Sequence, residues 1–144
     1  GNIELNMSEI NLDDLIASVI DSFSSLIQNK KINIKINSDS STIYADEKEM
    51  TIVLNNFISN AIKHTAGQIS INVLDQVFTI ENDGSSITDE QKEKIWDTYV
   101  SSDREGTGLG LAINKAILDL HHFKYDVYNT DKGVCFKVIC KKGV

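Results

Sequence analysis

Three glycines alternate with other residues in the segment Gly106-Thr107-Gly108-Leu109-Gly110-Leu111, which leads directly into a helical pattern. Backbone N–H groups of a glycine-rich segment bind anions well at this place, because a helix N-terminus carries partial positive charge. The spacing matches neither the dinucleotide fingerprint, which follows a strand, nor the Walker A loop, which needs Gly-Lys-Ser/Thr. The segment therefore predicts a site for phosphate groups.

A second candidate is a polar stripe formed by Asn56, Asn60 and Lys63. Their spacing of four and then three residues places them on one face of a helix. A carboxamide oxygen is a suitable ligand for Mg²⁺, which usually also keeps waters and bridges phosphates, and a lysine neutralises phosphate charge. An ordinary solvated face of an amphipathic helix explains the stripe equally well when it is taken alone.

A third candidate is Glu81-Asn82-Asp83-Gly84, at the end of an expected strand. Asn82 or Asp83 can accept a hydrogen bond from the exocyclic amine of adenine, and Gly84 allows a ligand to approach the backbone. Taken alone, an ordinary Asn-Asp-Gly turn is the simpler explanation.

Hydrophobic periodicity indicates the elements that must position these residues. Apolar residues recur at helical spacing over three segments and alternate over several shorter ones, many of them joined as hairpins. We expect helices near 12–27, 47–64 and 109–120, a short amphipathic piece near 89–96, and strands near 3–10, 32–36, 42–45, 69–73, 77–82, 124–129 and 134–140. This order predicts an α/β fold: a two-layer α/β sandwich with a mixed, mostly antiparallel sheet and helices on one face.

Composition narrows the function classes further. The chain has 144 residues and a net charge of −7, which argues against a nucleic-acid or anionic-membrane surface. No apolar run is long enough to span a membrane. Cys135 and Cys140 lie five residues apart in an expected strand, hence on opposite faces, which disfavours a disulfide between them.

The three candidates occur in a specific order, and together they resemble the ATP-binding catalytic domain of bacterial sensor histidine kinases. That domain belongs to the superfamily that includes gyrase B, the ninety-kilodalton heat-shock chaperone and MutL. The resemblance covers nearly the whole chain and implies a Bergerat-type fold with a long ATP lid. Residues 54–65 resemble the N box, 82–87 the G1 box, 95–99 the F box and 106–111 the G2 box.

The resemblance implies a role for each matching residue. Asn60 would bind Mg²⁺ with help from Asn56, Lys63 would contact phosphate, and His64 would flank the nucleotide. Asn82 or Asp83 would accept from adenine beside Gly84. The lid would bind phosphates through the glycine run, which consists of Gly106, Thr107, Gly108, Leu109 and Gly110.

The chain departs from the family pattern in two boxes. In the G1 box, Asn82 stands where the family has Asp, and Ser86 replaces the second glycine. Asn82 can still accept through its side-chain oxygen, and Asp83 becomes the acceptor if the strand end is shifted by one residue. In the F box, Trp96 and Tyr99 stand where Phe is common, which preserves large apolar side chains.

The residue at position 56 bears on the type of reaction. ATP-hydrolysing relatives carry a water-activating Glu four residues before the metal-binding Asn, whereas this chain has Asn56, which is no general base. Glu49, two turns earlier, is an acceptor-polarising candidate but is more simply a solvated residue. The resemblance therefore implies transfer of the γ-phosphoryl group rather than hydrolysis.

The partners are also implied by the resemblance. The phosphoryl acceptor would be a histidine on the protein's own dimerisation domain, which we do not find in this chain, and a response regulator would be served indirectly. The parent would be a homodimer, membrane-associated or cytoplasmic, with this domain inside the cell and touching neither membrane nor nucleic acid. Two other readings stay open: an ATPase of the gyrase–chaperone group, and a degenerate nucleotide-binding or docking module.

Overall fold

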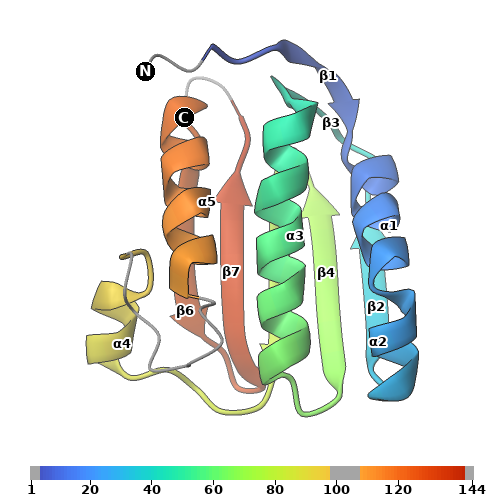
Figure 1. Ribbon diagram of the computed structural model, residues 1–144, viewed down its shortest axis with the longest axis vertical. Coiled ribbons are helices and arrows are strands. Elements are labelled where there is room, and N and C mark those ends of the chain that lie inside the picture. Colours follow the sequence, from blue (N-terminus) through green and yellow to red (C-terminus); the bar gives the residue numbers. More distant parts are fainter. Residues whose placement is uncertain (1–3, 98–107, 142–144) are drawn as a thin grey trace.

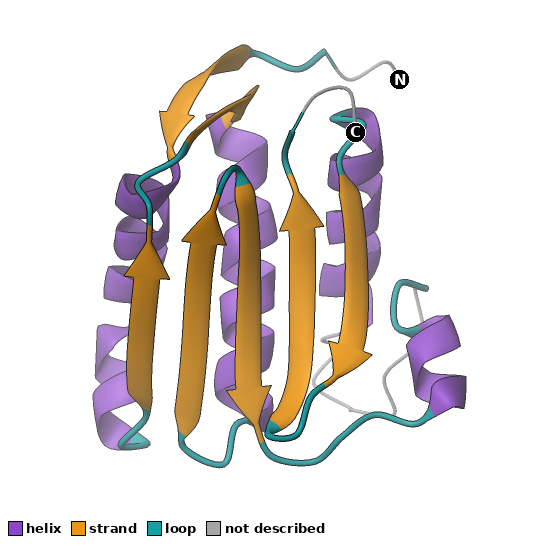
Figure 2. Ribbon diagram, turned by 180° about the vertical axis from the view of Figure 1, so that it is seen from behind, coloured by secondary structure: helices purple, strands orange, loops and turns teal. Residues whose placement is uncertain are grey.

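The computed structural model describes residues 4–97 and 108–141, which form two layers (Figures 1 and 2). Helices α1, α3 and α5 lie on one face of a five-stranded sheet, and Figure 2 shows the other face without a covering helix among the described residues. This confirms the expected α/β sandwich. In chain order the elements are β1 (Met7–Asn11), α1 (Leu12–Ser22), α2 (Ser24–Asn29), β2 (Asn33–Ser38), β3 (Thr42–Asp46), α3 (Glu47–His64), β4 (Gln68–Leu74), β5 (Val77–Asp83), α4 (Asp89–Lys94), α5 (Gly108–Leu120), β6 (Lys124–Asn129) and β7 (Gly133–Ile139).

The large sheet has the strand order β2-β4-β5-β7-β6 and is mixed, as expected. β2 pairs with β4 in parallel, and the other neighbours are antiparallel. β2 and β3 follow each other along the chain but do not form a hairpin, because β3 pairs with β1 in a separate two-stranded sheet. The parallel register sets Ile34 opposite Ile69 and Ile36 opposite Ile71, so that β2 adds apolar side chains to the helix-covered face of the sheet.

Helix α3 has the bounds expected from the sequence and lies at the centre of the helical layer (Figure 1). Asp46 caps its start by accepting from the N–H of Glu49 at 3.0 Å. Lys30 donates to the carbonyl of Ile62 at 3.4 Å near its end. The helix buries one apolar face, which consists of Met50, Val53, Leu54, Phe57, Ile58, Ala61 and Ile62.

The first helix ends earlier than its periodicity indicates. The sequence predicts one helix to residue 27, whereas α1 ends at Ser22 and α2 begins at Ser24. Between them the backbone of Phe23 has φ −104° and ψ 11°, and its N–H bonds to Ile20 in a tighter turn. Ser22 Oγ donates to the carbonyl of Val19 at 2.6 Å. Serines compete in this way for backbone groups, which explains the break in an otherwise periodic segment.

A buried histidine connects the end of α5 to the start of α3. Nε2 of His121 accepts from the backbone N–H of Asp46 at 3.0 Å, while Nδ1 lies 2.8 Å from the carbonyl of Ile117. These two bonds require a neutral ring with its proton on Nδ1. The Asp46 carboxylate in turn accepts from the N–H of Asn6 at 2.8 Å, so that the chain entering β1 is fixed to the same point.

No described helix is long and apolar enough to cross a membrane. Both cysteines are buried and neither forms a disulfide. Burial raises the pKa of both thiols, that of Cys140 to about 12. Cys135 and Cys140 therefore behave as small apolar residues at neutral pH.

Candidate functional site

The polar stripe of the N box lies on the central helix. Asn56, Asn60 and Lys63 are all half-buried, next to the apolar face that α3 turns towards the sheet. Neighbouring Asn55 is exposed and lies on another side of the helix. The stripe thus borders the interior of the molecule, which is where a bound group would be partly shielded from water.

Helix α5 packs beside α3 and contributes a residue that the sequence analysis did not single out. Asn114 is completely buried between the two helices. Its Nδ2 donates to the carbonyl of Val53 at 3.1 Å, and its Oδ1 accepts from Nδ2 of Asn56 at 2.9 Å. The available signal was a polar residue within the apolar stripe of the helix, whose other members Leu111, Ile117 and Leu118 are buried as well.

The strand end at 82–84 separates the two candidate adenine acceptors. Asn82 is buried with Phe78 and Ile80 on the helix-covered side of β5, because alternate side chains of a strand share a face. Its Nδ2 donates to the carbonyl of Asp83 at 3.1 Å. The Asn82 amide therefore lies on the same side of the sheet as α3 and α5, and its oxygen is the part suited to accept a hydrogen bond.

Asp83 instead holds the turn between α3 and β4. Its Oδ1 accepts from Thr65 Oγ1 at 2.6 Å and from the N–H groups of Ala66, Gly67 and Gln68 at 3.0, 3.1 and 3.0 Å. These donors, Thr65 foremost, lower the pKa of the Asp83 carboxyl and outweigh the opposing effect of burial. One carboxylate oxygen thus gathers three backbone donors and a hydroxyl of the turn at one point.

Gly84 is required by the fold itself. It has φ +126°, and a Cβ at this position would lie 2.8 Å from the backbone oxygen of His64. The sequence analysis expected a glycine that lets a ligand approach, whereas the group that approaches is the end of α3. Gly84 therefore sets how closely the G1 segment lies against the N-box helix.

Gly133, the first residue of β7, has a similar function on the other side of the strand end. A Cβ there would lie 2.2 Å from the backbone oxygen of Asn82 and 3.0 Å from the carbonyl carbon of Asp83. The adjacent Lys132 accepts from the N–H of Gly84 at 3.2 Å. The sequence alone does not reveal this role of Gly133, because the strand that it meets lies far away along the chain.

The segment that follows β5 is held in place at Ile87, which bonds to a residue of β6. Asn129 accepts from the N–H of Ile87 at 2.9 Å and donates to its carbonyl at 2.8 Å. α4 then begins with a reciprocal pair of bonds between Thr88 and Gln91. Trp96 of the F box packs edge-on against aromatic rings from α3, β6 and β7. Its ring centroid lies 6.2 Å from that of Phe57, 4.8 Å from that of Tyr125 and 5.7 Å from that of Phe136.

The predicted phosphate segment is described in part. Gly108, Leu109 and Gly110 form the first turn of α5, one residue earlier than expected. Gly106 and Thr107 lie outside the described residues, as does Tyr99 of the F box. Helix α5 begins next to the lower half of α3 and runs antiparallel to it (Figure 1).

His64 ends α3 and is exposed. Partial burial of the ring, and then the charges of Lys63 and Lys30, lower the pKa of His64. The ring is therefore neutral at neutral pH and presents a flat surface with a donor and an acceptor.

The described residues can form a metal site only together with a bound anion that supplies negatively charged ligands. They contain no group of three or more His, Cys, Asp or Glu side chains arranged to hold a metal ion. Asn56 and Asn60 supply neutral amide oxygens, which suit Mg²⁺ as additional ligands but do not balance its charge. A Mg²⁺ ion here would need phosphate oxygens from a bound nucleotide.

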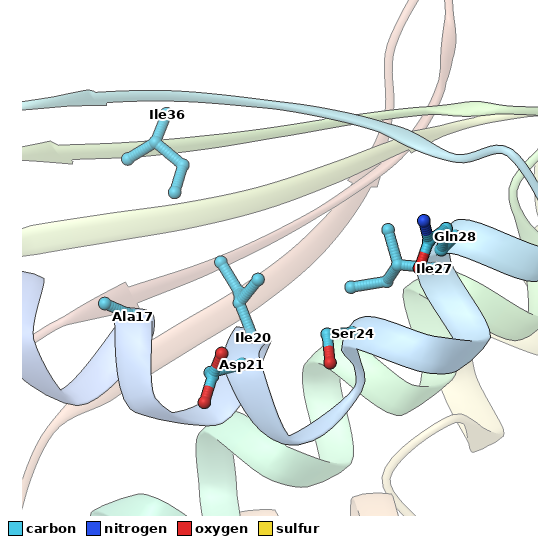
Figure 3. A pocket seen from close by; sticks show the side chains of 7 residues that line it. All are labelled: Ala17, Ile20, Asp21, Ser24, Ile27, Gln28 and Ile36. Carbon is cyan, nitrogen blue, oxygen red and sulfur yellow. The ribbon is translucent and has the colours of Figure 1, made fainter.

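A separate hollow lies between α1, α2 and the edge strand β2, away from these residues (Figure 3). Ala17, Ile20, Ile27 and Ile36 give it an apolar wall. None of the residues expected to bind nucleotide lines it; the remaining lining residues are Asp21, Ser24 and Gln28.

Comparison with known proteins gives consistent matches. A protein-family model described as histidine kinase-, DNA gyrase B- and HSP90-like ATPase matches residues 45–143. The catalytic domain of histidine kinase ThkA superposes with a TM-score of 0.83 at 30% identity, covering 93% of this chain and 94% of that one. Full-length ShkA in complex with AMPPNP superposes with a TM-score of 0.82 at 26% identity, covering 96% of this chain and 31% of that one.

Two curated relatives are named as a sensor protein and a sensory kinase. The heme sensor protein HssS of Staphylococcus aureus is 32% identical over 122 residues, which is 79% of this chain and 27% of the relative. The adaptive-response sensory kinase SasA of Crocosphaera subtropica is 26% identical over 150 residues, covering 94% of this chain and 39% of the relative. The chain therefore spans less than half the length of these relatives.

Proposed function

Because the chain belongs to the family of histidine kinase-, DNA gyrase B- and HSP90-like ATPases, and matches sensor histidine kinases over its catalytic domain, we propose that it binds Mg-ATP for phosphoryl transfer. The γ-phosphoryl group passes to a histidine on a separate dimerisation domain, and from there to a response regulator. The observation that carries this proposal is the half-buried polar face of α3, on which Asn56 meets Asn114 of α5.

Adenine is bound at one end of this site, which we call the adenine end: residues 82–84 with the turn at 65–68. The Asn82 side chain accepts from the exocyclic amine, because it lies on the side of β5 covered by the helices. Asp83 is the weaker candidate, since its Oδ1 already accepts four hydrogen bonds from the turn. His64, exposed and neutral, flanks the nucleotide.

The phosphates are bound at the other end, the phosphate end: Asn56, Asn60 and Lys63 with Asn114 and the start of α5. Lys63 neutralises phosphate charge, and Asn60 and Asn56 direct amide oxygens to the metal. Backbone N–H groups of residues 106–110 surround the phosphates at the helix start. Mg²⁺, when bound with the nucleotide, neutralises charge that develops on the transferred group.

Transfer is favoured over hydrolysis, because Asn56 cannot remove a proton from water. This is the feature that separates the proposal from an ATPase of the gyrase–chaperone group. The parent protein is proposed to be a homodimeric sensor, membrane-associated or cytoplasmic, with this domain in the cytoplasm. That view rests on the heme sensor protein HssS and the sensory kinase SasA, of which this chain matches only a part.

A thermal-shift titration of the 144-residue chain with ATP and Mg²⁺ tests the proposal. Ligand that binds only the folded chain raises its melting temperature with concentration. We expect a saturable rise with ATP and Mg²⁺, and a smaller one with ATP and EDTA. No rise at millimolar ATP with Mg²⁺ would contradict the proposal and favour a docking module that binds no nucleotide.

A further inference from the structure

Asn114 is a buried amide between α3 and α5, with none of its surface exposed. An amide at such a position costs free energy unless its polar atoms are hydrogen-bonded. Here Nδ2 donates to the carbonyl of Val53 at 3.1 Å and Oδ1 accepts from Nδ2 of Asn56 at 2.9 Å. Both ends of the amide are therefore used, one by backbone and one by a side chain of the proposed phosphate end.

These two bonds determine which way the Asn56 amide faces. A backbone carbonyl only accepts, so Val53 requires the nitrogen of Asn114 on its side. The oxygen of Asn114 then faces Asn56, and only the nitrogen of Asn56 can meet it. The Oδ1 of Asn56 is consequently turned away from Asn114. A fixed backbone group thus sets the orientation of the Asn56 amide through one intermediate side chain.

We propose that Asn114 is a positioning residue for nucleotide-bound Mg²⁺: it holds Asn56 with its oxygen, not its NH₂ group, towards the metal. This inference rests on the proposed function. Rotation of the Asn56 amide by half a turn would present N–H donors to a cation, which repel it. Asn114 excludes that rotation, because two acceptor oxygens would then face each other in a buried place.

The bond to Val53 already joins α5 to α3, and a purely structural role asks only for some donor to satisfy the buried oxygen of Asn114. The second bond goes to a half-buried side chain on the polar stripe and not to another core group. Outer residues that orient metal ligands in this way commonly change metal affinity by about tenfold to a hundredfold when they are lost. The proposal therefore predicts a loss specific to the metal.

Isothermal titration calorimetry of the 144-residue chain with the variant Asn114→Leu tests this. The leucine side chain has a volume similar to that of asparagine and no polar atoms. We expect affinity for ATP with Mg²⁺ to fall about tenfold, and affinity for ATP in EDTA to change less than about twofold, within the range of ordinary mutational scatter. The control is Ile117→Val, which removes one methylene from the same buried face of α5. It should leave both affinities within about twofold.

A double variant shows whether Asn114 acts through Asn56. In the Asn56→Ala background, Asn114→Leu should cause no further loss of affinity for Mg-ATP, because the side chain that it orients is absent. If Asn114→Leu does not fold, Asn114→Ser replaces it, since serine is too short to reach Asn56. Nuclear magnetic resonance provides a readout without nucleotide: the side-chain amide protons of Asn56 should exchange faster with water in either variant.

The outcomes separate this inference from the proposed function. If the wild-type chain binds ATP better with Mg²⁺ but Asn114→Leu keeps that preference, the positioning role is wrong and the proposed function stands. Equal losses with and without Mg²⁺ would show a structural role only. If the wild-type chain shows no binding of ATP, both proposals fall.

Discussion

The adenine end and the phosphate end of the proposed site are held by different kinds of bond. At the adenine end, one oxygen of the Asp83 carboxylate accepts from four donors of the turn. Gly84 and the adjacent Gly133 let backbone segments pack more closely than a side chain would allow. At the phosphate end, neutral amides of Asn56 and Asn114 join two helices through side chains. The first arrangement is part of what makes the chain fold, whereas the second orients groups for a ligand.

This difference gives opposite expectations for substitution. Changes at the adenine end should reduce the stability of the fold, and nucleotide affinity only as a consequence, with Asn82 as the exception. Changes at the phosphate end should reduce affinity for Mg-ATP while the fold stays intact.

The largest effect is expected for Gly133→Ala. Its Cβ would overlap the backbone oxygen of Asn82, and backbone on both sides must shift, which should lower the free energy of unfolding by about 3 kcal/mol. Urea denaturation measures this. Ser70→Ala, on the uncovered face of β4, is the control and should change stability by less than about 0.5 kcal/mol. A loss below about 1 kcal/mol for Gly133→Ala would show that the strand end is looser than described.

Next in size is Asn60→Ala at the phosphate end. We expect affinity for Mg-ATP to fall about tenfold to a hundredfold, or about 1.4 to 2.7 kcal/mol, with an unchanged melting temperature. Calorimetric titration gives the affinity. Asn55→Ala is a matched control, because it removes the same amide from an exposed position five residues earlier on α3. Equal losses in the two variants would contradict the assignment of the polar stripe.

A smaller effect distinguishes the two candidates for adenine. Asn82→Ala should weaken ADP binding about tenfold, because a buried acceptor for the amine is lost, whereas Asp83→Asn should weaken it less than about threefold. Both affinities are measured with ADP in EDTA, so that the phosphate end contributes little. The reverse order would make Asp83 the acceptor.

The smallest effect is on the pH dependence of stability. A carboxyl whose pKa is lower in the folded than in the unfolded chain stabilises the fold above its unfolded pKa, and the effect disappears as pH falls through the folded value. In the folded chain, hydrogen bonds from Thr65 and from the backbone of the turn hold the pKa of the Asp83 carboxyl below its ordinary value of 3.8. Asp83→Asn should therefore cost about 1–2 kcal/mol at pH 7, and the difference from wild type should shrink below pH 3.8. Urea denaturation at pH 7, 5 and 3 measures it; a constant difference would mean that charge is not involved.

Hydrophobic periodicity was enough to predict those elements of the fold whose contacts lie close together in the sequence. The bounds of α3 follow from its periodic apolar face and from the capping residue Asp46, and the hairpin β4–β5 follows from alternation around a short turn. The parallel pairing of β2 with β4 could not be read in the same way, because its partner lies 35 residues further along the chain. The break at Phe23 was missed because the apolar spacing continues through it, whereas the Ser22 hydroxyl bonds to the backbone just before it.

The candidate site shows the same division. Motif order identified the family and pointed to Asn56, Asn60 and Lys63, whose roles remain predictions. It did not reveal that Asp83 is engaged by the turn at 65–68, or that Asn114 meets Asn56, since both contacts join segments distant in sequence. A polar residue inside an apolar helical stripe is the kind of signal that would have found Asn114.

The central claim is that both ends bind one nucleotide. A titration of the ¹⁵N-labelled chain with Mg-ATP, followed by nuclear magnetic resonance, tests it most directly. We expect amide signals of residues 56–65 and of residues 82–84 to shift together with one dissociation constant, while signals of β2 stay in place. Shifts at one end only, two different dissociation constants, or no shifts would contradict the claim.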